Sequence, residues 1–359
     1  MAQTVRGTTR RAVQLPLVDG FLWLIRIGAL VAIVWGSYNS LTSGRLSGAQ
    51  WQDLVIFGLS QGSVYALIAL GYSMVYGVLR FINFAHGEVF MAGTMIGFFV
   101  ADGLSRTKLW TEQVWLSLFI VLASSVAIST SIAVLLERVA YRRLRGRARL
   151  IPFITAIGAS FFLQYAFAGL FGADVKNYPP VAQLEGKVRF LGFQLLKTQV
   201  VVLIAAVVMM LFLFFFVEKT KRGKAIRAVA EDQETARLMG INVDRTIVLV
   251  FALGGAMAGV AAFLWALVFG QAHFFIGFFP GIKAFTAAVL GGVGNIVGAM
   301  VGGLVLGLIE SVAPSLILVG LHIPAAHQLK DVVTFLALVL ILIFRPTGIL
   351  GERLAEDRV

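Results

Sequence analysis

Long apolar stretches alternate along the chain with short polar loops. A helix needs about 20 apolar residues to cross the hydrocarbon core of a bilayer. Stretches that approach or exceed this length are 21–38, 54–79, 88–104, 114–137, 151–171, 198–217, 246–269, 283–319 and 331–344. Membrane β-barrel strands alternate apolar and polar residues instead. The pattern therefore predicts an all-α protein, a polytopic bundle of transmembrane helices.

The stretch 283–319 is too long for one ordinary helix, and glycines interrupt it near residue 292. It fits either two crossings or a re-entrant half-helix followed by one crossing. We adopt two crossings, which give about ten spans of bilayer length. One crossing would give nine spans and place the C-terminal arginines outside; two place them in the cytoplasm (Arg345, Arg353 and Arg358).

Composition supports a membrane protein. Of 359 residues, 59% are hydrophobic and only 13% are charged, whereas soluble domains carry about 25% charged residues. The mean hydropathy is +0.89. A fold of this size cannot bury so much apolar surface internally, so the remainder requires lipid. The absence of cysteine excludes disulfides, thiolate metal sites and cysteine nucleophiles.

The net charge of +12 comes from basic residues gathered in a few loops. Six arginines lie within 138–149, and seven basic residues lie within 218–245. Both loops fall on the cytoplasmic side when the N-terminus is inside, as the positive-inside rule requires. Loops 39–52, 105–113 and 172–197 then lie outside. The charge is explained by orientation in the membrane, which excludes nucleic acid as a partner.

Residues 1–49 hold a basic tail and the first apolar stretch. That stretch fits either a cleaved signal peptide or a retained anchor helix. We favour an anchor, because no clear small-x-small cleavage site follows Trp35 closely.

The predicted cytoplasmic stretch 224–245 is polar, with apolar residues at helical spacing. Residues 234–240, Glu-Thr-Ala-Arg-Leu-Met-Gly, resemble the Glu-Ala-Ala-x-x-x-Gly core of the cytoplasmic loop in ABC importer permeases. We expect a helix over 225–240 that docks in an ATPase cleft, with Gly240 at positive φ for the return of the chain. A solvated surface helix is the alternative. The coupling candidates are Glu231, Asp232, Glu234, Ala236, Arg237 and Gly240. The three carboxylates among them could pair with basic groups on the ATPase.

Seven glycines lie within 291–307. Faces of small residues let helices approach closely in lipid. Tight packing within one subunit and a hinge or subunit interface lining the pathway are both consistent with this pattern. The packing or hinge candidates are Gly291, Gly294, Gly298 and Gly302.

Polar groups inside predicted spans are pathway candidates by default. Those selected as pathway or gate residues are Gln61, Tyr65, Tyr72, Asn83, His86 and Glu88; Ser63, Gln164 and Glu310 are further polar groups. A polar hairpin that caps helix ends is the alternative for residues 80–88. Glu310 has no evident partner in the sequence. No second carboxylate or histidine accompanies His86 at metal-ligand spacing, so no metal site is expected.

The chain lacks the Gly-x-x-x-x-Gly-Lys-Ser/Thr phosphate loop and a nucleophile–base pair, which argues against an enzyme. Several stretches in order resemble the branched-chain amino acid permease of ABC importers, in particular its H-type subunit. They are 62–77, 82–93, 230–245, 281–307 and 330–351. On this basis 50–351 is the permease domain, 1–49 an additional N-terminal segment and 352–359 a short C-terminal tail.

The resemblance implies a multi-pass protein of the bacterial inner membrane that imports branched-chain amino acids or similar small polar solutes. It implies a heterodimer with an M-type permease, two cytoplasmic ATPases that bind ATP and Mg²⁺, and an extracytoplasmic binding protein. No cofactor is expected in this chain. A urea or short-amide permease is one alternative. An ion-coupled transporter or channel is another, disfavoured by the apparent lack of a paired acid–base relay in the spans.

Overall fold

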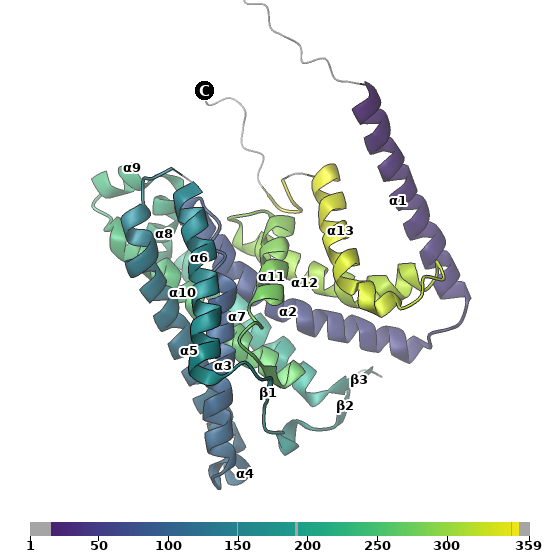
Figure 1. Cartoon of the computed structure of the whole chain (residues 1–359), viewed down its shortest axis with the longest axis horizontal. Coiled ribbons are helices and arrows are strands. Elements are labelled where there is room, and N and C mark those ends of the chain that lie inside the picture. The colour runs from purple at the N-terminus through teal and green to yellow at the C-terminus, as the bar shows by residue number, and fades with distance from the viewer. Residues whose placement is uncertain (1–15, 149, 191–192, 346, 352–359) are drawn as a thin grey trace, which may run out of the picture.

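The computed structural model describes residues 16–148, 150–190, 193–345 and 347–351 (Figure 1). Most of them lie in helices. The helices are α1 (Pro16–Thr42), α2 (Gly48–Leu79), α3 (His86–Ser105), α4 (Leu109–Glu112), α5 (Val114–Leu136), α6 (Leu150–Phe171), α7 (Lys197–Lys219), α8 (Lys221–Glu231), α9 (Gln233–Leu238), α10 (Val243–Phe269), α11 (Phe278–Gly291), α12 (Ile296–Ala313) and α13 (Lys330–Phe344).

Short π- and 3₁₀-helical segments extend or connect these helices. They are η1 (Glu137–Tyr141), η2 (Arg142–Leu144), η3 (Ala182–Leu184), η4 (Pro314–Leu318) and η5 (Ala326–Leu329). Two small antiparallel sheets complete the structure: β1 (Lys176–Asn177) pairs with β4 (Gln271–Ala272), and β2 (Lys187–Phe190) pairs with β3 (Phe193–Leu196).

The prediction of an all-α polytopic membrane protein is confirmed. Within the described ranges, nine helices are long and apolar enough to cross a bilayer. The glycine-rich stretch is divided into α11 and α12. At 14 residues, α11 is roughly 21 Å long, shorter than the hydrocarbon core of about 30 Å. The ten predicted segments thus correspond to nine long helices and one short one.

Some helices begin earlier than hydrophobicity alone predicts. The predicted second span starts at residue 54, but α2 begins at Gly48 behind a capping box in which Ser47 and Gln50 satisfy each other's backbone N–H groups. Likewise, α11 begins at Phe278 rather than at 283. The domain boundary proposed at residue 49/50 falls in the first turn of α2 and stays a prediction.

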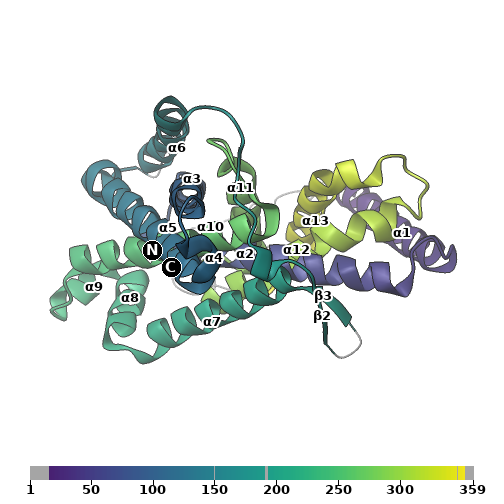
Figure 2. The same ribbon diagram turned by 90° about the horizontal axis from the view of Figure 1, so that it is seen from below.

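Helices α2 and α10 form the centre of the bundle (Figures 1 and 2). In each, 72% of the most apolar window is buried within the chain, against 11% for α1 and for α13. The exposed sides of α1 and α13 are strongly apolar, as expected of surfaces that face lipid. Sites built on α2 and α10 are therefore enclosed by the most buried helices of the chain.

The two ends of the bundle differ in character. Figure 1 places α8, α9 and the end of α13 toward one end, and α4, β1, β2 and β3 toward the other. This arrangement fits the prediction that the loop carrying α8 and α9 and the chain after α13 share a side of the membrane. Arg345 is among the residues described, whereas Arg353, Arg358 and the tail 352–359 lie outside them.

Glycines on α12 form two packing faces. A Cβ at Gly298 or Gly302 would overlap backbone atoms of α11, at Gly291 and Ala287 respectively. A Cβ at Gly303 or Gly307 would overlap α2 instead. Gly291 packs against Gly298 in return, and Gly294 holds the intervening turn at φ +91°. The close packing expected of Gly291, Gly298 and Gly302 is thus found within one chain, and a hinge role stays a prediction.

Helix α1 packs on the end of α12. Gly36 lies against Ile317 of η4, and the Ser40 hydroxyl donates a 2.8 Å hydrogen bond to the Ser315 carbonyl. Asn39 donates to the Gly320 carbonyl at 3.4 Å. These contacts join the additional N-terminal helix to the last third of the chain.

Candidate functional site

The cytoplasmic segment is not the single helix that we expected over 225–240. It breaks at Asp232, whose backbone is extended at φ −150° and ψ 115°. The Asp232 carboxylate accepts hydrogen bonds from the backbone N–H groups of Glu234 and Thr235, at 2.8 and 3.2 Å, and so caps α9. Aspartate at this position stabilises the start of a helix, which is why the chain divides into α8 and α9.

This capping changes the role expected for Asp232. Hydrogen bonds from the Thr235 side chain and from backbone N–H groups hold the pKa of Asp232 below its usual range. Its carboxylate is therefore occupied within the chain, whereas Glu231, Glu234 and Arg237 are exposed. Ala236 is buried and packs inward rather than on the exposed surface.

The end of α9 presents an apolar tip to its surroundings. Leu238 is 88% exposed and Met239 is 77% exposed. Gly240 follows at φ +82°, in open space where a Cβ would meet no other atom within 4 Å. The positive φ predicted for Gly240 is confirmed, and it turns the chain sharply back toward α10. Two neighbouring large apolar side chains on a polar segment are typical of a contact surface.

Two hydrogen bonds connect this segment to the central helix α2. Gln233 donates through Nε2 to the Val78 carbonyl at 2.8 Å. Arg80, which ends α2 in a left-handed conformation at φ 57°, donates to the Ala230 carbonyl at 2.8 Å. These two hydrogen bonds hold α8 and α9 against the end of α2.

A buried polar cluster surrounds the start of α3. Glu88 is 1% exposed, and its Oε1 accepts hydrogen bonds from Gln164 at 2.7 Å and Ser160 at 3.2 Å, both on α6. Its other oxygen has no hydrogen-bond partner among the described residues. The Tyr141 hydroxyl donates a 2.6 Å hydrogen bond to Asn83 Oδ1. The structure thus gathers Asn83 and Glu88 with partners from α6 and η1.

His86 and Tyr72 lie beside this cluster. Their rings meet edge to face, with centroids 4.8 Å apart. The imidazole fits because Gly71 has no side chain: a Cβ there would collide with His86. Neither side chain caps a helix end, so the capping alternative for His86 is not what the structure shows.

A second buried cluster contains a charge pair that the sequence interpretation missed. Gln61 Nε2 donates to the Tyr65 hydroxyl at 2.6 Å and to Glu310 Oε1 at 2.8 Å. Lys283 Nζ lies 2.7 Å from the same Glu310 oxygen and 2.7 Å from Asp331. The side chains of Lys283 and Glu310 are 6% and 1% exposed.

This cluster corrects two expectations. Glu310 does have a partner, and a paired acid and base do lie within the spans. Lys283 and Asp331 are the first residues of predicted spans, where charges are inexpensive. Because α11 begins five residues earlier, at Phe278, Lys283 is enclosed by the bundle instead. Lys283 and Glu310 lie 27 residues apart along the chain, so no local pattern reveals the pair.

The fold and these buried polar sites define a multi-pass helical membrane protein. A profile of the family described as "Branched-chain amino acid transport system / permease component" matches residues 54–342, and the chain belongs to this family. A relative from Pseudomonas aeruginosa, the high-affinity branched-chain amino acid transport system permease protein BraD, is 43% identical over 83% of this chain and 95% of its own length.

Two further relatives are also permease proteins. The high-affinity branched-chain amino acid transport system permease protein LivH of Escherichia coli K12 is 41% identical over 82% of this chain and 94% of its own length. The galactose/methyl galactoside import permease MglC of E. coli is 24% identical over 77% of this chain and 79% of its own. With its apolar helices, the chain is thus an ABC-type permease subunit, a multi-pass protein of the bacterial inner membrane. Membership in this family argues against an ion-coupled transporter or channel. The lack of a paired acid and base can no longer be used as an argument against that alternative, because Lys283 and Glu310 form such a pair.

Proposed function

We propose that this chain is the translocation subunit of an ATP-driven importer for branched-chain amino acids or similarly small polar solutes. Its partners would be an M-type permease, two cytoplasmic ATPases that bind ATP and Mg²⁺, and an extracytoplasmic binding protein. The chain itself would carry out no catalysis. The identity of 41–43% with BraD and LivH over more than four fifths of the chain supports this substrate class.

The exposed tip of α9 is the observation that supports ATPase coupling. Leu238 and Met239 stand clear of the protein surface, and desolvation of such apolar groups favours binding to a partner. The flanking Glu234 and Arg237 supply a polar rim. Because Gln233 and Arg80 join α8 and α9 to the end of α2, a movement of a docked ATPase would reach the centre of the bundle.

The test is reconstitution of the complete complex in proteoliposomes, with ATP hydrolysis and leucine uptake as readouts. Loaded binding protein should stimulate hydrolysis. Leu238→Ser should lower the co-purified ATPase and the stimulated hydrolysis at least fivefold. Leu150→Ser, at a 70% exposed position on the same side, is the matched control and should leave both unchanged. Equal behaviour of the two variants would contradict the docking role of α9.

A urea, short-amide or sugar permease is the alternative in the same architecture. The same vesicles distinguish it: binding-protein-dependent uptake of urea or galactose without uptake of leucine, isoleucine or valine would replace the amino acid assignment.

A further inference from the structure

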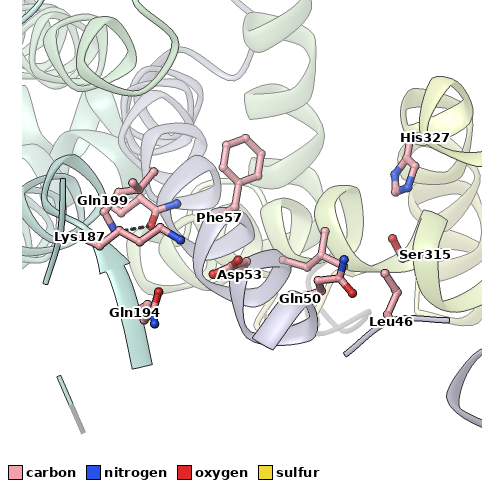
Figure 3. Close-up of a pocket in the computed structure, with 11 residues that line it drawn as sticks. Leu46, Gln50, Asp53, Phe57, Lys187, Gln194, Gln199, Ser315 and His327 are labelled. Carbon is pink, nitrogen blue, oxygen red and sulfur yellow. Dashed lines mark hydrogen bonds between the residues drawn. The ribbon is translucent and has the colours of Figure 1, made fainter. Parts of the chain in front are cut away.

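A pocket of about 450 Å³ opens at the first turns of α2, on the side of the molecule that carries β2 and β3 (Figure 3). Its walls come from α2, from the hairpin β2–β3, from the start of α7, and from η4 and η5. Seven of the eleven residues that line it carry polar side chains: Gln50, Asp53, Lys187, Gln194, Gln199, Ser315 and His327. By the predicted topology this is the extracytoplasmic side.

The pocket and the buried Lys283–Glu310 cluster share three stretches of chain, whereas Lys283 itself comes from α11, which does not line the pocket. On α2, Phe57 of the pocket lies one helical turn before Gln61 of the cluster. Near α13, His327 of the pocket stands four residues before Asp331. On α12 and η4, the pocket residue Ser315 follows Glu310 by five residues. Each element thus runs from the pocket to the cluster within one or two turns, about 5 Å each.

A hydrogen bond connects the two levels. The Ser311 hydroxyl, next to Glu310, donates at 2.6 Å to the carbonyl of Leu54, which lines the pocket. Ser315, at the pocket wall, is 1% exposed and its hydroxyl has no hydrogen-bond partner among the described residues. Ser311 and Ser315 therefore lie on the stretch of chain that runs from Glu310 to the pocket wall.

The cluster holds two positive and two negative side chains, and one of its carboxylate oxygens can accept a further hydrogen bond. Lys283 and Lys330 face Glu310 and Asp331. Glu310 uses Oε1 for Gln61 and Lys283, while its buried Oε2 has no hydrogen-bond partner in the described part of the chain. An unsatisfied carboxylate oxygen in a low-dielectric interior favours binding of a cation. The adjacent Lys283 ammonium contacts the two carboxylates of Glu310 and Asp331, at 2.7 Å each, so a solute carboxylate binds there by replacing one of them. A solute with only one charge would leave the other side chain without compensation.

We propose that the pocket and this cluster form one solute site for a zwitterion, a molecule that carries an ammonium and a carboxylate group. Glu310 receives the ammonium and Lys283 the carboxylate, while Gln61 and Tyr65 supply neutral hydrogen-bonding groups. The site rests on the proposed function as an importer and deepens it, because it assigns recognition of the two charged ends of an amino acid to named residues of this chain.

Cysteine accessibility tests the route, since the chain has no native cysteine. In the reconstituted importer, Ser315→Cys should react with a cationic methanethiosulfonate added on the binding-protein side, and reaction should lower leucine uptake at least tenfold. Thr107→Cys, exposed in a loop away from the pocket, should react without loss of uptake. If position 315 reacts with uptake unchanged, or is inaccessible from that side, the route is wrong.

Charge variants test the recognition. Glu310→Gln should lower leucine uptake at least tenfold, and Glu310→Asp should restore part of it. Lys283→Met/Glu310→Gln/Asp331→Asn removes Lys283 together with both carboxylates that it contacts, so none of the three is left as a charge without its partner. If the cluster is only structural, this triple variant should return uptake to within about twofold of the parent, which would overturn the proposal. If the pair binds solute, uptake should stay at least tenfold low.

The ATPase readout separates this inference from the proposed function. In the Ser315→Cys and Glu310→Gln complexes, loaded binding protein should still stimulate hydrolysis, which shows that assembly and coupling persist. Absence of stimulation in the unmodified complex would overturn the proposed function itself, before any variant is compared.

Discussion

The hydrogen bond between Tyr141 and Asn83 is a contact whose removal leaves a buried acceptor without a donor. Both side chains are at most 3% exposed. We expect Tyr141→Phe to destabilise the folded protein by about 1–3 kcal/mol, measured as thermal unfolding in detergent. Tyr165→Phe, at a 67% exposed position, should change stability by less than about 0.5 kcal/mol. Equal losses would show that the Asn83 contact contributes nothing specific.

Gly240 isolates the effect of backbone conformation, because no atom lies within 4 Å of its missing Cβ. Gly240→Val should therefore act only through its φ of +82°, at a cost of roughly 1–2 kcal/mol. We expect normal membrane insertion but reduced stimulated ATP hydrolysis in the reconstituted complex. Gly240→Asn should retain more hydrolysis, because asparagine tolerates this region. Full activity of the valine variant would show that the turn is not required.

Residue-level roles were predictable where they depend on neighbours in sequence. The positive φ of Gly240 could be predicted from the motif that precedes it. The capping box at Ser47 and Gln50 is likewise a local signal, which defines the start of α2. Partners distant in sequence could not be found this way. Glu88 meets Gln164 across 76 residues, and Gln61 meets Glu310 across 249.

At the level of helices, the packing of α12 on α11 depends on how closely their two backbones approach each other. We expect Gly302→Leu to force α12 away from Ala287 on α11, lowering stability by about 3 kcal/mol and shifting the thermal transition in detergent downward. Gly158→Leu on α6, where nothing lies within 4 Å, places the same side chain toward lipid and should be neutral. A neutral Gly302→Leu would show that α11 and α12 separate readily.

Spans were predictable because hydrophobicity and length are local properties. Nine of the ten predicted spans correspond to helices long enough to cross a bilayer, whereas the tenth, α11, has only 14 residues. The break at Asp232 was not foreseen, because the apolar periodicity of α8 continues into α9. A side chain that caps its own chain competes with that periodicity, and here the cap prevails.

For the whole molecule, the distribution of basic residues predicts which ends face the cytoplasm. Introduced cysteines at Ser43 and Glu185 should be labelled by an impermeant thiol reagent added to intact cells. Cysteines at Glu234 and Arg345 should be labelled only after permeabilisation. Labelling of position 345 from outside would mean that α11 does not cross the bilayer and would contradict the ten-segment topology. Labelling of position 234 from outside would reverse the orientation of the entire chain.

The two glycine faces of α12 also determine which coding mutations this stretch of the gene tolerates. Any single-nucleotide change in a glycine codon that alters the amino acid introduces at least a Cβ atom. At Gly298, Gly302, Gly303 and Gly307 that atom would meet backbone on a neighbouring helix, which cannot move aside as a side chain can. This short stretch of gene therefore has almost no permissive missense neighbours. In a saturation-mutagenesis library selected for uptake, it should stand out as a strip of depleted codons with a four-residue repeat.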